Sequence, residues 1–182
     1  MKKTVLTFGL IAGLIISVLM DSSLLLADKI GSGHSMILGY TIMVASFLLI
    51  YFGIRSYRDN TLGGEISFGR ALSCGILIAL ITSVCYVAMW EVLYFNFMPD
   101  FMDNYGAHTI EKLKASGASP EAVQVQVQKL KEFKEQYKNP LFNSLMTFIE
   151  PFPVGLGITL LSAAVLRKKA QSRPVQLPSP AS

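Results

Sequence analysis

The sequence has little that could serve thiol or metal chemistry. It contains two cysteines and two histidines in 182 residues. Cys74 and Cys85 fall on one apolar block, about 16 Å apart along a helix, which is too far for a disulfide between them. His34 and His108 lack the spacing of metal ligands. We therefore expect two buried apolar cysteines, no metal and no cofactor.

The motifs that mark common enzymes are missing as well. There is no Gly-x-Ser-x-Gly elbow, no His-Glu-x-x-His pair and no dinucleotide-binding glycine loop. Charged residues make up 15% of the chain, and the formal net charge of +4 is spread over span ends rather than gathered in one basic patch. We expect a protein that is not an enzyme and does not bind nucleic acid.

Apolar residues, in contrast, are abundant and come in long blocks. They make up 52% of the chain, and the mean hydropathy is +0.47. A bilayer core about 30 Å thick requires roughly 20 consecutive apolar residues in a helix. Four blocks qualify: residues 4–27, 36–54, 71–95 and 141–166. The expected fold is an all-α integral membrane protein, a bundle of four transmembrane helices whose first span is not cleaved as a signal peptide.

The position of the charges predicts the orientation of the chain. The five arginines flank span ends that fall on one side of the membrane: Arg55, Arg58, Arg70, Arg167 and Arg173. The long loop at residues 96–140 carries six lysines balanced by six acids. Because positive residues favour the cytoplasmic side, we expect both Lys2 and Ser182 to be cytoplasmic and the long loop to be extracytoplasmic.

Two spans carry small residues at intervals of four. The first has Gly9, Gly13 and Ser17, and the third has Ala71, Gly75, Ala79 and Ser83. Small residues let helix backbones approach closely in lipid. We expect these ridges to pack the bundle, with a homo-oligomer contact as the alternative.

The long loop has the pattern of an amphipathic helical hairpin. Asp103 or Asn104 is the predicted cap of a first helix, which ends near Gly117. Ser119, followed by Pro and Glu, is the predicted cap of a second. One apolar stripe follows: Val123, Val127, Leu130, Phe133 and Tyr137. We expect this hairpin to lie over the spans. Residues 170–182, rich in Ser, Pro and Gln, should form a disordered cytoplasmic tail after a membrane domain at residues 1–169.

Three acids lie in or beside the spans at a similar predicted height: Asp21, Glu91 and Glu150. Span four is interrupted there, because Pro151 and Pro153 lack the amide hydrogens that would bond the carbonyls of Thr147 and Ile149. Broken helices with an acid resemble the cation sites of transporters. A packing kink with acids that reach water is the other interpretation, and the sequence leaves both open.

The loop between spans two and three groups charged, aromatic and glycine residues: Arg55, Tyr57, Arg58, Asp59, Gly63, Gly64, Phe68 and Gly69. Arginines beside a membrane commonly bind lipid headgroups, which is the expected role here. A phosphate-binding turn is the alternative, although Gly63-Gly64 lacks the spacing of a phosphate loop.

These motifs carry a resemblance to a known family. They read Tyr51-Phe-Gly-Ile-Arg55, Gly63-Gly-Glu-Ile-Ser-Phe-Gly-Arg-Ala71 and Glu150-Pro-Phe-Pro-Val-Gly155. With the four-span layout, the chain resembles, over residues 1–169, the bacterial membrane family catalogued as domain of unknown function 4199. The resemblance implies a multi-pass protein of the bacterial inner membrane and brings no catalytic residue with it.

Two functional hypotheses follow. The first is an accessory or structural membrane component, surrounded by the lipid bilayer, with a second copy of itself or another membrane protein as partner. The second is a small transporter, or a proton- or cation-responsive protein, that uses the three acids.

Overall fold

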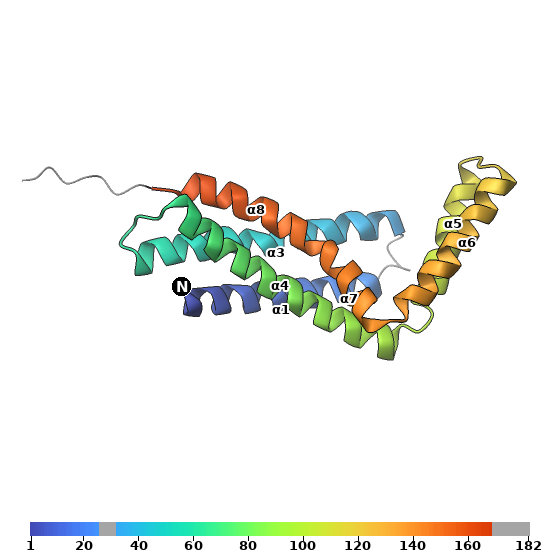
Figure 1. Cartoon of the computed structure of the whole chain (residues 1–182), viewed down its shortest axis with the longest axis horizontal. Helices are drawn as coiled ribbons and strands as arrows, with labels where there is room; N and C mark the ends of the chain where they lie inside the picture. The colour runs from blue at the N-terminus through green and yellow to red at the C-terminus, as the bar shows by residue number, and fades with distance from the viewer. Residues whose placement is uncertain (26–31, 169–182) are drawn as a thin grey trace, which may run out of the picture.

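A computed structural model describes residues 1–25 and 32–168 of the chain, and these residues are predominantly helical (Figure 1). Within those two ranges the chain forms no β-strand. Four stretches are long and apolar enough to cross a membrane: Lys2–Met20, Ile37–Thr61, Phe68–Phe97 and Pro140–Leu166. The predicted all-α bundle of four spans is therefore confirmed.

The first three spans are single helices and the fourth is divided. They are α1 (Lys2–Leu25), α3 (Ser32–Thr61), α4 (Phe68–Phe97), α7 (Pro140–Ile149) and α8 (Pro151–Leu166). Helix α3 continues past the apolar block that ends at residue 54, so its last two turns are polar. Arg55 and Asp59, one turn apart, form an ion pair of 3.6 Å there.

Helix α4 lies at the centre of the packing. It contacts α1, α3, α7 and α8, and α3 in turn contacts both α1 and α8. The most deeply buried large side chains come from different helices and meet in one core, among them Ile16, Phe47 and Ile78. Many side chains on the outer faces of the same helices are apolar and exposed, as a bundle in lipid requires.

The small-residue ridges are close contacts between helices, as predicted. A Cβ placed on Gly13 of α1 would lie 2.6 Å from the Cβ of Cys85 on α4, and one on Gly75 of α4 would lie 2.5 Å from Cγ2 of Thr159 on α8. Both distances are far shorter than a contact between carbon atoms allows. The ridges therefore set how near α1 and α8 come to α4. Cys74 is buried and Cys85 half-buried in this packing.

The bundle has two distinct ends. Figure 1 shows the N-terminus, the α3–α4 loop and the end of α8 at one end, which we call the terminal end. The other end, the hairpin end, carries α5 (Phe101–Ala115) and α6 (Pro120–Tyr137). This hairpin runs across the end of the bundle at a steep angle to the spans (Figure 1).

The hairpin's turn agrees with the sequence, but its first boundary does not. The Ser119 hydroxyl accepts from the Ala122 amide at 3.3 Å, and Gly117 has a left-handed φ of +79°. Helix α5, however, begins at Phe101 after Asp100, not after Asp103 or Asn104. Its first turn is stabilised by packing of Phe101 and Met102 against the bundle rather than by a polar cap. The tail predicted at residues 170–182 lies outside the described residues.

Replacing Gly75 should measure the cost of separating α4 from α8. The methyl group of Gly75→Ala would collide with Thr159, so we expect the free energy of unfolding to fall by about 1–3 kcal/mol. Gly157→Ala, on α8, is the matched control, since a Cβ there meets nothing within 4 Å. Chemical denaturation in detergent measures the stability of both variants. Equal stability would contradict the close contact between α4 and α8 at Gly75.

Candidate functional site

Two of the three predicted acids lie on one interface. Glu91 of α4 accepts a hydrogen bond of 2.9 Å from the Ser144 hydroxyl of α7. Glu150, between α7 and α8, lies 3.4 Å from the Tyr86 hydroxyl of α4, which donates to Oε2. Asp21 belongs to α1, but its side chain lies outside what the structure describes. Glu91 and Glu150 are thus brought together along the contact between α4 and α7.

Asn143 of α7 is the best-bonded residue of this contact. It is fully buried, and its Oδ1 accepts from the Trp90 indole at 3.0 Å and from the Thr147 hydroxyl at 3.2 Å. Its Nδ2 donates to the backbone carbonyl of Tyr137 at 3.4 Å. One amide therefore joins α4, α6 and α7. We call the whole set of residues the polar seam: Tyr86, Trp90, Glu91, Asn143, Ser144, Thr147 and Glu150.

Asn143 was not identified from the sequence as a residue of the candidate site. A signal was present, because an Asn inside an apolar block must find hydrogen-bond partners in lipid. Thr147 follows it one helical turn later, on the same face. The pattern could have indicated a polar contact here, although not that Trp90 and Tyr137 provide it.

The predicted break in span four lies at the end of the polar seam that is farther from the hairpin. Glu150 ends α7 and begins α8 with helical dihedral angles, φ −71° and ψ −59°, so the chain bends without a loop. Pro151 is buried and Pro153 exposed. Glu150 is exposed as a whole residue, although its Oε2 lies in a part-buried contact with Tyr86, and Glu91 is half-buried. Among the described residues, no three His, Cys, Asp or Glu side chains gather closely enough to hold a metal ion.

Aromatic rings join the hairpin to the bundle just beyond the seam. Trp90 meets Phe101 at a centroid distance of 4.9 Å, and Tyr94 meets Tyr137 at 5.2 Å, both edge to face. The Tyr137 hydroxyl lies 3.2 Å from that of Thr147. We call these rings the aromatic anchor: Trp90, Tyr94, Phe101, Phe133, Tyr137 and Phe142. Burial of both ends of the hairpin in this anchor fixes its base.

Farther from the bundle, α5 and α6 are joined by charge and separated by a groove. Lys134 forms an ion pair with Asp103, and this hydrogen bond raises the pKa of the lysine. The groove has a volume of about 400 Å³. The apolar stripe of α6 is therefore divided: Phe133 and Tyr137 enter the aromatic anchor, whereas Val127 and Leu130 line the groove.

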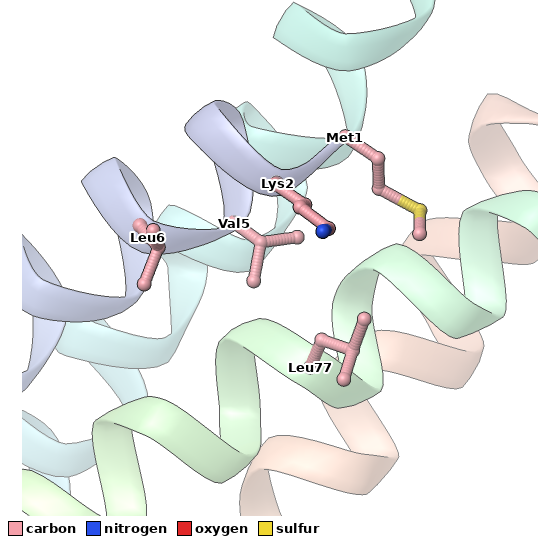
Figure 2. A pocket seen from close by; sticks show the side chains of 5 residues that line it. All are labelled: Met1, Lys2, Val5, Leu6 and Leu77. Atoms are coloured by element: carbon pink, nitrogen blue, oxygen red, sulfur yellow. The ribbon is translucent and has the colours of Figure 1, made fainter.

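A second, smaller pocket lies at the terminal end between α1 and α4. Figure 2 shows Val5 and Leu6 on one wall and Leu77 on the other, with the Lys2 side chain beside Met1. Its volume is about 270 Å³. The surface that these residues present to the pocket is apolar, so the pocket suits a hydrocarbon chain better than a polar substrate.

The family described as Protein of unknown function (DUF4199) matches residues 7–168. The chain belongs to this family. No curated protein and no solved structure is detectably similar to it. The matched part of this DUF4199 chain contains the polar seam, the aromatic anchor and the hairpin.

The loop motif of the DUF4199 chain closes the terminal end. Gly63 and Gly64 have left-handed φ angles of +70° and +92°, and the Gly64 amide donates to the Arg58 carbonyl at 2.9 Å. Beyond the turn, Ile66 and Lys168 exchange two backbone hydrogen bonds of 3.1 and 3.0 Å. These amides are used within the fold, which supports a structural turn over a phosphate-binding one.

The other side chains of this motif have structural contacts too. Arg58 binds Asp59 at 2.7 Å and also reaches the Leu166 carbonyl at 3.4 Å. Tyr57 is buried in the core, whereas Phe68 is 39% exposed and a Cβ on Gly69 would meet nothing within 4 Å. Arg55 is exposed beside Asp59. The motif thus ends α3, begins α4 and binds the end of α8.

Removing the Asn143 amide should destabilise this DUF4199 chain more than an ordinary surface change. Asn143→Ala leaves the buried Trp90 indole without its acceptor, so we expect a loss of about 1–3 kcal/mol in the free energy of unfolding. Asn104→Ala, on the exposed face of α5, should change it by less than about 0.5 kcal/mol. Chemical denaturation followed by Trp90 fluorescence measures both, and equal losses would contradict the role of the seam.

Proposed function

We propose that this DUF4199 protein is a non-enzymatic accessory component of a membrane, in which the bundle holds the hairpin ready to receive a partner protein. One observation carries the proposal. The base of the hairpin is fixed by the aromatic anchor, while the groove along its length is left open.

A fixed base and an open groove are the properties of a docking element. Ordering an interface before binding reduces the entropy that binding costs. The anchor and the Asp103–Lys134 pair provide that order here. Within residues 1–25 and 32–168, no other segment lines this apolar groove, which favours a partner as its occupant.

The competing role, transport or a response to protons or cations through Asp21, Glu91 and Glu150, has less support. Glu91 accepts from Ser144 and Glu150 from Tyr86. Both carboxylates therefore accept hydrogen bonds that hold α7 against α4. This structural role explains why acids occur here without requiring a bound cation.

For the location, we propose the bacterial inner membrane, with both termini in the cytoplasm and the hairpin outside. The family resemblance supports the compartment. The charge pattern supports the orientation, since Arg55, Arg58, Arg70 and Arg167 all belong to helix ends at the terminal end.

Reporter fusions test this orientation. An alkaline phosphatase that is active only outside the cytoplasm should be active when inserted near Ser119 and inactive when fused after Lys169. Activity after Lys169 but not near Ser119 would show the opposite orientation. Activity at both positions would show that the fourth span, which lies between them, does not cross the membrane.

A photoreactive side chain in the groove tests for the partner. Placed at Val127 in native membranes, it should give one discrete protein adduct, because Val127 lines the groove. Val125 is the matched control: it lies two residues away on α6, is 55% exposed and does not line the groove. Mass spectrometry identifies the adducts. Only lipid and intramolecular adducts from Val127 would contradict the proposal.

A further inference from the structure

The groove between α5 and α6 has an apolar floor and a charged rim. The floor residues come from both helices: Met102, Ala107, Ile110, Val127 and Leu130. Two helices alone cannot enclose such a floor, because each helix of a hairpin can cover only one side of the other. A third helix laid along the groove would complete the layer, as in other complexes in which a helix binds a groove.

We propose that this groove binds an amphipathic helix of a partner protein, whose apolar stripe packs on the floor and whose acidic side chains pair with Lys114 and Lys131. The inference rests on the proposed function and adds the class of partner and the groups that recognise it.

The charges on the rim favour an acidic partner. Lys134 is already paired with Asp103, and Glu111 lies 3.8 Å from the His108 imidazole. Lys114 and Lys131 also line the groove, one from each helix, and neither forms a salt bridge with any residue that the structure describes. Two ammonium groups beside an apolar floor therefore favour a partner that carries carboxylates at matching positions.

The shape of the wall favours a helix. Gly106 lies midway along α5, and a Cβ placed on it would meet nothing within 4 Å. The absence of a side chain there lets another backbone come close.

A protein helix fits the rim better than a lipid does. The carboxylates of Asp103 and Glu111 lie on the same rim as the lysines, so an anionic headgroup would meet charges of its own sign. A helix can place an acid beside each lysine and a neutral residue beside each carboxylate.

Two probe peptides test the charge preference with the full chain in phosphatidylcholine nanodiscs. Both carry the same leucine stripe at helical spacing, flanked by glutamates in one peptide and by lysines in the other. Fluorescence anisotropy should give a Kd about tenfold lower for the acidic peptide. The double variant Lys114→Glu, Lys131→Glu should reverse this preference.

Matched variants separate the groove from net charge. Lys112→Glu combined with Lys129→Glu changes the charge equally at exposed sites outside the groove, and it should keep at least half of the preference for the acidic peptide. Gly106→Leu adds a side chain to the groove at a position where a Cβ meets nothing within 4 Å, and it should abolish binding, whereas Asn104→Leu, on the exposed face, should not. Equal affinities for the two peptides, or equal effects of the two double variants, would overturn the proposal.

Other occupants give different results. If the chain dimerises and Gly106→Leu makes it monomeric, the occupant is a second copy and the proposal is wrong. It is also wrong if native mass spectrometry finds a phospholipid that wild type retains and Gly106→Leu releases. An adduct at Val127 without a preference for the acidic peptide would overturn this inference and leave the proposed function standing. That preference without any protein adduct would support the groove chemistry and contradict the proposed function.

Discussion

The hydrogen bonds of Asn143 hold together the half of the molecule that faces away from the terminal end. The fourth span is divided by two prolines, so its outer piece, α7, has only 10 residues and could not keep its place by helix formation alone. The Asn143 side chain binds Trp90 of α4 and the last residue of α6, and both bonds lie where water does not compete. The aromatic anchor packs directly beside them. The position of the hairpin, and with it the direction in which the groove opens, depends on this amide and on the aromatic anchor together.

The opposite end is held by backbone hydrogen bonds together with the Arg58 side chain, which reaches the Leu166 carbonyl. The turn at Gly63 and Gly64 directs the α3–α4 loop toward the end of α8, where Ile66 and Lys168 pair. Between the two ends, α4 approaches α1 and α8 through glycines, so the bundle has little freedom to expand. Polar bonds thus fix both ends, and steric contact fixes the middle.

The parts that could be predicted from the sequence are those that depend on local pattern. Length and hydropathy predicted the four spans, helical spacing predicted the packing role of Gly13 and Gly75, and capping predicted the start of α6. The predicted start of α5 was wrong because Phe101 and Met102 pack against the bundle, and this packing begins the helix earlier than a polar cap at Asp103 or Asn104 would. Glu91 and Glu150 were predicted at one height, but their partners Ser144 and Tyr86 could not be, since no periodicity tells which faces of α4 and α7 meet.

The pairing of Ile66 with Lys168 has a consequence for how the chain is made. About 100 residues separate the two, and Lys168 is synthesised well after Ile66. While the ribosome is still producing the hairpin and α7, Ile66 in the loop after α3 does not yet have Lys168 to pair with. We expect the first three spans to insert as a loosely ordered group, and the terminal end to close only when α8 has entered the bilayer. Synthesis of α8 and of Lys168 after it would then be the step that permits the terminal end to assemble.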